Sequence, residues 1–230
     1  LVTASENHPL RRLDPSGLLT PLAGTGSKGF KDGEGTGAAF NWPADLVEDA
    51  QGNLYVSDRF NHAIRKITPG GEVSTLAGDG EAGYDDSKGK NARFNEPMGL
   101  AIGPDQVLYV ADSKNHVIRK VTLDTGEVTT YAGSGFEGSR EDTRDKAEFR
   151  IPTSIAFDPQ GRLLIVDRFN HRVREVTADE RVRTLVGTGQ PELLDPESKQ
   201  SEGLSYPVDM LLDPEGTIYI VDYGNHAIRK

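Results

Sequence analysis

The chain has 230 residues, no cysteine, and a formal net charge of −10 with a pI near 5.0. This length is enough for one well-buried domain, and the lack of cysteine excludes disulfides, thiolate nucleophiles and cysteine-ligated metals. The acidic balance argues against nucleic acid as a partner, because affinity for a phosphate backbone rests largely on cationic side chains. We expect no membrane span, since no apolar stretch approaches the ~20 residues that a spanning helix needs.

All five histidines occupy one position of a repeated phrase. Each follows an asparagine, and successive histidines are separated by 54, 54, 55 and 55 residues. They are His8, His62, His116, His171 and His226. Histidines scattered by chance would not keep this spacing, so the chain is an internal repeat and its residues must be interpreted as an array.

The two ends of the chain are predicted to hold incomplete repeats. Residues 1–26 should supply the second, third and fourth strands of an atypical first repeat, in which Ala4 replaces a recurrent aspartate and Pro9 follows the histidine. Residues 205–230 should supply the first strand, the second strand and most of the third strand of the last repeat.

Each repeat between these ends is predicted to contain four short strands. The first begins at a proline and ends in a turn rich in Gly, Asp and Asn; these prolines are Pro43, Pro97, Pro152 and Pro207. The second is an apolar run that ends in aspartate, at residues 54–58, 108–112, 163–167 and 218–222. The third alternates apolar and charged residues, as a half-solvated strand does, at residues 63–68, 117–122 and 172–177. The fourth follows a turn, at residues 73–78, 128–133 and 182–187.

Four short antiparallel strands per repeat, without helical periodicity, predict an all-β fold: a β-propeller of about five four-stranded blades. We expect the first strand of each blade to be innermost and the charged third and fourth strands to lie outside. Neither end supplies cleanly what the other lacks. We therefore expect residues 1–230 to form a single propeller domain within a longer chain with further domains, and both a five-bladed and a six-bladed ring remain open.

The repeated phrases at residues 54–67, 108–121 and 218–230 resemble NHL repeats, a family named for its Asn-His-Leu triplet. The Gly-rich linkers at 23–43, 77–97 and 132–152 are similar to the blade connections of bacterial members, whereas the linker at 186–207 departs from their pattern. The third letter of the triplet is Ala, Val, Arg or Pro here. The resemblance covers nearly the whole chain and implies a β-propeller; it also implies that a few members bind RNA.

The Asn-His turns and the linkers are predicted to share one face of the blades, because strand direction alternates. Loops carried on a rigid scaffold are the usual location of recognition, and aromatic and arginine side chains are typical of binding surfaces. The predicted ligand-binding residues in the turns are Arg59, Phe60, Lys114, Arg168, Phe169 and Tyr223. Those in the linkers are Phe30, Tyr84 and Phe136.

The Asn-His pairs themselves are interpreted as structural. One histidine per blade places neighbouring imidazoles too far apart to share an ion at ~2 Å ligand distances, so we expect these side chains to satisfy backbone groups of the turn and of the next blade. The aspartates that end the second strands are expected to make Asx-type bonds to backbone amides. They are Asp58, Asp112, Asp167 and Asp222.

The position two residues after each linker proline breaks the repeat, because it holds Asp45, Gly99, Ser154 and Asp209. In a six-bladed ring Asp45 and Asp209 would face one another across the channel. With Ser154 nearby they could bind Ca²⁺ or a cationic ligand, since hard cations take oxygen ligands; the alternative is that this is an ordinary strand start. No other cofactor is predicted.

The sequence favours a non-catalytic binding or scaffold module for a protein, peptide or glycan, because nothing in it assembles a nucleophile, a base and an orienting group. The alternative is a metal-dependent hydrolase or lyase, similar to lactonase propellers, with a channel metal held by carboxylates such as Asp45 and Asp209. The bacterial style of the repeats and the lack of cysteine suggest a secreted or periplasmic protein.

Overall fold

The computed structural model describes residues 2–3, 9–193 and 203–230. His8, Asn7 and Ala4 therefore lie outside the described residues. The chain forms two compact units. The first is Leu1–Ile102 with Gln106–Leu108 and Lys120–Thr129; the second is Gly103–Asp105 and Tyr109–Arg119 with Thr130–Lys230.

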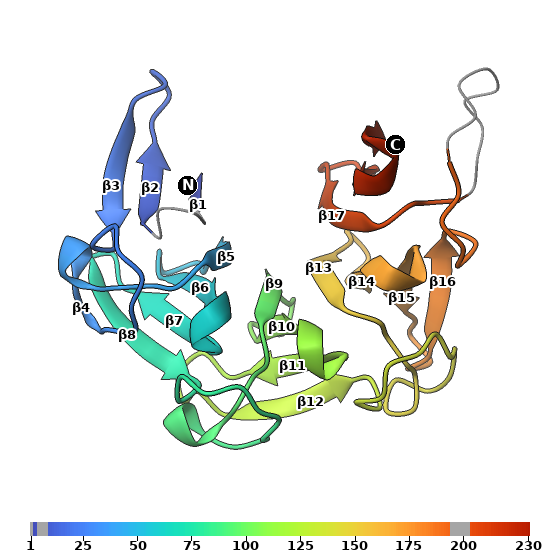
Figure 1. Ribbon diagram of the computed structural model, residues 1–230, viewed down its shortest axis with the longest axis horizontal. Helices are drawn as coiled ribbons and strands as arrows, with labels where there is room; N and C mark the ends of the chain where they lie inside the picture. The colour runs from blue at the N-terminus through green and yellow to red at the C-terminus, as the bar shows by residue number, and fades with distance from the viewer. Residues whose placement is uncertain (1, 4–8, 194–202) are drawn as a thin grey trace. The chain divides into compact units, whose positions relative to one another are not determined.

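The described strands form small antiparallel sheets that follow the repeats (Figure 1). The first sheet has the order β1-β2-β3, with β1 at Val2–Thr3, β2 at Leu10–Leu13 and β3 at Leu19–Ala23. The second has the order β4-β8-β7-β6-β5, with β4 at Gly33–Glu34, β5 at Pro43–Glu48, β6 at Leu54–Asp58, β7 at Ala63–Ile67 and β8 at Glu72–Ala77. The two-residue β4 comes from a linker and was not predicted; it pairs with β8 through Gly33 opposite Val73.

The remaining sheets repeat this plan. The third consists of β9 at Pro97–Ile102, β10 at Leu108–Asp112, β11 at Val117–Val121 and β12 at Val128–Ala132, and the boundary between the two units passes through it. The fourth consists of β13 at Pro152–Phe157, β14 at Leu163–Asp167, β15 at Arg172–Val176 and β16 at Val182–Val186. The fifth consists of β17 at Pro207–Leu212, β18 at Ile218–Asp222 and β19 at Ala227–Arg229. These sheets confirm the predicted β-propeller blades, including the three-stranded first and last ones.

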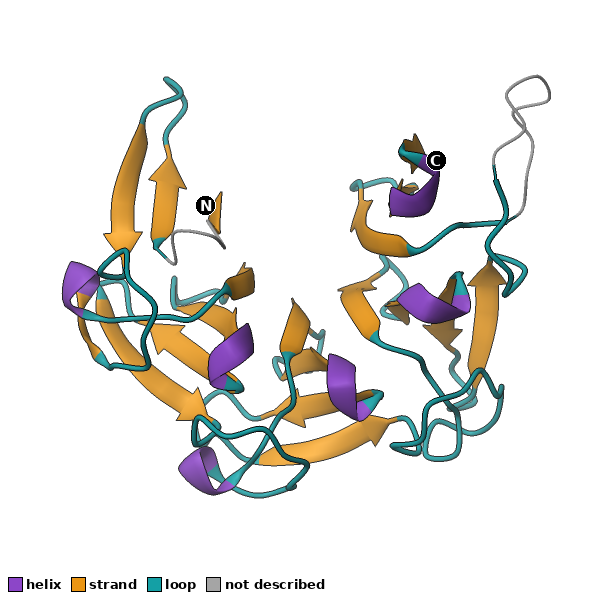
Figure 2. Ribbon diagram, in the orientation of Figure 1, coloured by secondary structure: helices purple, strands orange, loops and turns teal. Residues whose placement is uncertain are grey.

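Each described Asn-His turn is a single turn of 3-10 helix, drawn in purple in Figure 2. These helices are Arg59–Asn61, Ser113–Asn115, Arg168–Asn170 and Tyr223–Asn225. The histidine that follows each helix has a left-handed backbone, with φ between 48° and 58°. Two further 3-10 helices lie in the linkers, at Gly35–Gly37 and Gly89–Asn91.

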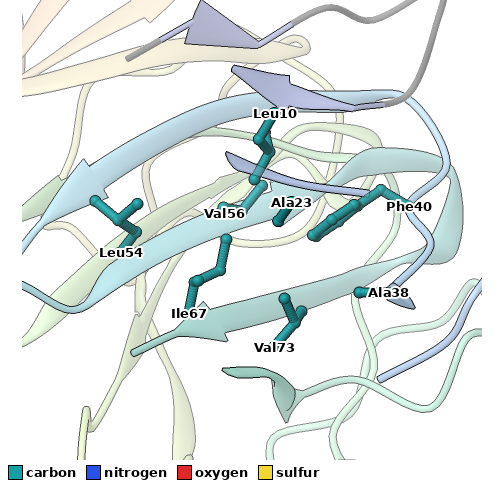
Figure 3. Close-up of a cluster of buried hydrophobic side chains, with 8 residues drawn as sticks. All are labelled: Leu10, Ala23, Ala38, Phe40, Leu54, Val56, Ile67 and Val73. Carbon is teal, nitrogen blue, oxygen red and sulfur yellow. The ribbon is translucent and has the colours of Figure 1, made fainter. Parts of the chain in front are cut away.

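The core consists of apolar side chains that alternate along the strands and face a neighbouring blade. In the first unit one such cluster joins the first and second sheets (Figure 3), and Phe40 of the linker belongs to it and has no exposed surface. In the second unit Leu164 and Val166 of β14 pack with Met210 and Ile220 of the last blade. Burial of these faces fixes the register of each strand, because a one-residue slip would expose them.

The strand order agrees with the prediction that the third and fourth strands lie outside the first two. The interpretation of the third strands as half-solvated, however, is wrong for one charged residue in each of three repeats. Arg65, Arg119 and Arg174 are fully buried and are among the largest buried side chains of the molecule. Each guanidinium pairs with the aspartate at the end of the neighbouring second strand. The alternating pattern predicts a strand correctly, but it does not reveal that the charge of this arginine is compensated inside the blade.

Candidate functional site at the Asn-His turns

A buried carboxylate organises each Asn-His turn that the structure describes. In the second repeat, Asp58 Oδ2 accepts hydrogen bonds from Arg65 Nη1 at 2.7 Å and from Asn61 Nδ2 at 2.8 Å. Its Oδ1 accepts the backbone N–H of Asn41, in the preceding linker, at 2.7 Å. Burial raises the pKa of the Asp58 carboxyl, and these three donors oppose that rise.

The same network recurs in the second unit. Asp167 Oδ2 accepts from Arg174 Nη1 at 3.0 Å and from Asn170 Nδ2 at 2.8 Å, and its Oδ1 accepts the backbone N–H of Arg150 at 2.7 Å. Asp222 makes the equivalent contacts in the last blade. We expected the aspartate to accept a backbone N–H from its own turn, and this is wrong. The N–H belongs to a linker residue 17 positions earlier, so the aspartate connects the strand, the turn and the linker.

The asparagine and histidine fasten the turn to the linkers on either side. Asn61 Nδ2 also donates to the carbonyl of Gly29 at 2.7 Å, and Asn170 Nδ2 to that of Gly138 at 2.6 Å. His62 Nδ1 accepts the backbone N–H of Glu96 at 3.1 Å, and this residue directly precedes the first strand of the next blade.

The histidine contact is repeated within the second unit, where His116 Nδ1 accepts from Ile151 N at 3.2 Å and His171 Nδ1 from Tyr206 N at 3.0 Å. These contacts confirm the structural interpretation of the histidines. Because Nδ1 is an acceptor only in the neutral ring, the turn requires uncharged histidine. Burial lowers the pKa of His62, His116 and His171 in agreement with that requirement.

The residue before each linker proline has an uncommon backbone. Trp42, Glu96, Ile151 and Tyr206 all have positive φ, between 48° and 60°, a conformation that L-residues with a Cβ adopt rarely. In the three repeats just described, the histidine bond holds the residue in this conformation. For Glu96 and Tyr206, the side chain contacts the preceding turn.

In the first unit this arrangement brings together four side chains. Arg59 Nε and Nη2 both donate to Glu96 Oε2, at 3.1 and 2.6 Å. The Arg59 guanidinium also lies 4.7 Å from the centre of the Phe60 ring, and the ring centres of Phe60 and Trp42 are 5.7 Å apart. Arg59 and Phe60 were predicted to be ligand-binding residues, and the structure places them in one cluster whose charge is already neutralised.

In the second unit the equivalent turn carries a larger aromatic cluster. Phe169 and Tyr206 meet edge to face with ring centres 5.6 Å apart, and the Arg168 guanidinium lies 5.3 Å from the Phe169 ring and 5.9 Å from the Tyr223 ring. Phe169 is 36% exposed, Tyr206 37% and Tyr223 60%. We call these four residues, Arg168, Phe169, Tyr206 and Tyr223, the aromatic-arginine cluster.

The other predicted ligand-binding residues of the turns and linkers are Phe30, Tyr84, Phe136 and Lys114. Phe30 is partly exposed and lies 5.1 Å from the buried Arg65 guanidinium. Tyr84, Phe136 and Lys114 are exposed. Phe136 does not occupy the repeat position of Phe30 and Tyr84, since it follows its linker glycine pair at a different distance.

Sequence reasoning missed Trp42 and Tyr206. A signal was present, because both residues directly precede a linker proline and the position before each of these prolines recurs once per repeat. It also missed the buried arginines, although an arginine follows each of the four described aspartates at the same distance of seven residues.

The predicted metal ligands are engaged in backbone contacts. Asp45 Oδ1 accepts the N–H of Leu46 at 2.7 Å, and its Oδ2 accepts that of Leu100 in β9 at 2.8 Å. Asp209 Oδ1 accepts the N–H of Met210 at 2.8 Å, and Ser154 is buried. Among the residues that the structure describes, no three His, Asp or Glu side chains gather as a metal would need. The Ca²⁺ site thus stays a prediction, and for Asp45 the contacts favour the alternative of an ordinary strand start.

These blades, joined through histidine-fastened turns, define a β-propeller repeat protein. The chain contains NHL repeats: the family model described as NHL repeat matches residues 94–121 and 149–175. No helix of the described residues has the length and apolar character to cross a membrane.

Known proteins with similar sequences are much longer. Protein SUPPRESSOR OF QUENCHING 1, chloroplastic, from Arabidopsis thaliana is 41% identical over 43% of this chain, which corresponds to 10% of that protein. NHL repeat-containing protein 2 from Gallus gallus is 35% identical over 51% of this chain and 16% of that protein. Among solved structures, an auxiliary nutrient binding protein from Bacteroides thetaiotaomicron VPI-5482 matches with a TM-score of 0.68 at 17% identity, over 92% of this chain and 49% of that one. This structural likeness shows the fold alone.

Proposed function

We propose that the chain is a non-catalytic recognition module that binds a protein or peptide partner on the face formed by its Asn-His turns. The observation that carries this proposal is the aromatic-arginine cluster. Its side chains are partly exposed, yet they stand on a turn whose backbone is held by Asp167, Asn170 and His171. Preorganised aromatic and arginine side chains of this kind are typical of the residues that dominate binding energy.

The setting of the module also supports a scaffold role. The curated relatives are far longer than this chain, in keeping with our prediction that it is one part of a larger polypeptide. The secreted or periplasmic localisation remains a proposal that rests on composition and repeat style.

A displayed library of random peptides, selected on the purified chain, tests this function. We expect the selected peptides to lose at least about tenfold in affinity, roughly 1.4 kcal/mol, when Phe169→Ser and Tyr223→Ser are combined. The control is Leu185→Ser, which removes a side chain of similar exposure (37%) from β16 of the same unit. Equal losses in both variants, or no selectable peptide at all, would contradict the proposed function.

A further inference from the structure

The same five-residue turn occurs in both units, but its arginine is neutralised by a carboxylate in the first unit only. The five residues Asp-Arg-Phe-Asn-His occur at 58–62 and again at 167–171. Both copies form a 3-10 helix that ends in a left-handed histidine, and both histidines accept the N–H of the residue before the next linker proline. That residue is Glu96 for the first copy and Tyr206 for the second.

This single difference changes the partner of the arginine. In the first copy Glu96 neutralises Arg59 through both Nε and Nη2. In the second copy Tyr206 brings no carboxylate, and the Nε of Arg168 is buried without a hydrogen-bond partner among the described residues. A buried donor without an acceptor costs free energy that an incoming acceptor would recover. Arginine pairs most strongly with a carboxylate that contacts two of its N–H groups.

The surroundings of Arg168 suit an acidic residue within an apolar segment. Phe169, Tyr206 and Tyr223 offer partly exposed rings on which apolar groups can pack. A second cationic residue lies near, because the backbone carbonyl of Arg150 accepts the N–H of Phe169 at 3.1 Å; the side chain of Arg150 is paired with Glu137 at 2.6 Å. The chain as a whole carries a net charge of −10, so a highly acidic partner would be repelled at longer range, whereas one carboxylate between apolar residues would not.

We infer that Arg168 receives a glutamate or aspartate side chain of the bound peptide, with Phe169, Tyr206 and Tyr223 packing on its apolar neighbours. In the first unit Glu96 occupies the corresponding place as a built-in mimic of that ligand. The inference rests on the proposed function and adds the chemistry that the partner must present.

The test uses one matched pair of substitutions. Tyr206→Glu installs the carboxylate that the other unit already has, so it should occupy Arg168 from within and weaken peptide binding about tenfold or more. Tyr206→Gln has nearly the same size without the charge and should bind the selected peptides more tightly than Tyr206→Glu. Arg168→Gln should weaken binding as Tyr206→Glu does, whereas Arg59→Gln should not. Thermal melting of each variant establishes that it is folded.

The probes are peptides from the displayed library, synthesised with blocked termini, each beside a version with its acidic residue replaced by the corresponding amide. We expect the selected peptides to share a Glu or Asp and to lose affinity when it is neutralised. If the peptides bind in a Phe169-dependent manner but tolerate neutralisation, or if Tyr206→Glu and Tyr206→Gln bind alike, the carboxylate inference is wrong while the proposed function stands. Binding that requires a free C-terminus would likewise overturn the assignment to a side chain.

Discussion

At the scale of single residues, the same amino acid at the same repeat position has two different energetic roles. Arg59 and Arg168 begin identical turns, but only Arg59 has a carboxylate partner. Sequence inspection placed both on one predicted binding face and could not separate them. The distinction depends on a residue 37 or 38 positions later, Glu96 or Tyr206, which the fold brings beside the turn.

This difference predicts opposite effects of one substitution on stability. Arg59→Gln removes a two-point pair that is only 26% and 21% exposed at its two side chains, and we expect a loss of about 1 kcal/mol in the free energy of unfolding. Arg168→Gln removes a charged group with an unsatisfied Nε, so the free energy of unfolding should be unchanged or slightly raised. Denaturant unfolding of both variants measures this, and a larger loss at Arg168 would contradict the assignment.

The turn histidines predict a loss of stability in mild acid. Burial lowers the folded-state pKa of His62, His116 and His171 below the ordinary value of 6.5. The unfolded chain then binds more protons, so the contribution of these rings is fully present above about pH 6.5 and is lost as pH falls through their lowered folded-state values. Melting temperature measured from pH 8 to pH 5 should fall more steeply for the wild type than for His116→Ala. Parallel curves would show that this histidine is not coupled to folding.

At the scale of elements, an ion pair joins the second and third strands of the four blades that carry the recurrent aspartate, and it is fully buried in three of them. Asp58 and Arg65 have no exposed side-chain surface, and their pair is supplemented by Asn61 and by the N–H of Asn41. The recurrent spacing of seven residues between aspartate and arginine was visible in the sequence. The sequence did not show that this arginine is buried, because the alternation of apolar and charged residues is the same whether the arginine is solvated or enclosed by the linker.

Removing one member of this pair should be far more costly than removing both. Arg65→Met leaves Asp58 charged and buried without its cation, which costs about 3–5 kcal/mol. Combining Arg65→Met with Asp58→Asn removes both charges and should recover part of that loss. A double-mutant cycle by denaturant unfolding gives the coupling energy, and additive losses would show that the two side chains act independently.

At the scale of the whole molecule, the chain is an array of similar blades in which most polar groups serve the framework. The recurrent Asp, Asn, His and Arg side chains make hydrogen bonds to backbone or side-chain groups within the described residues, as Asp58, Asn61, His62 and Arg65 do. Candidates for function are therefore the positions at which repeats differ. The residue before the linker proline and the first two residues of each turn are such positions.

The same reasoning applies to the proposed calcium site at Asp45 and Asp209. Because both oxygens of Asp45 already accept backbone N–H groups, we expect millimolar calcium to leave the melting temperature unchanged. The measurement compares the wild type with Asp45→Asn combined with Asp209→Asn, together with elemental analysis. A calcium-dependent rise in the wild type that the double variant lacks would restore the metal interpretation and justify a screen for lactone and ester substrates.

The sequence by itself determined the fold class, the order of strands in each blade and the structural role of the histidines. It could do so because these depend on local alternation, turn chemistry and a period of 54 or 55 residues. Only the tertiary structure decided which charges are buried and which arginine lacks a partner. Those properties arise from contacts between a turn, the linker before it and the linker after it. The repeat spacing was visible in the sequence, but it does not show which of these distant residues contact one another or which of them are enclosed.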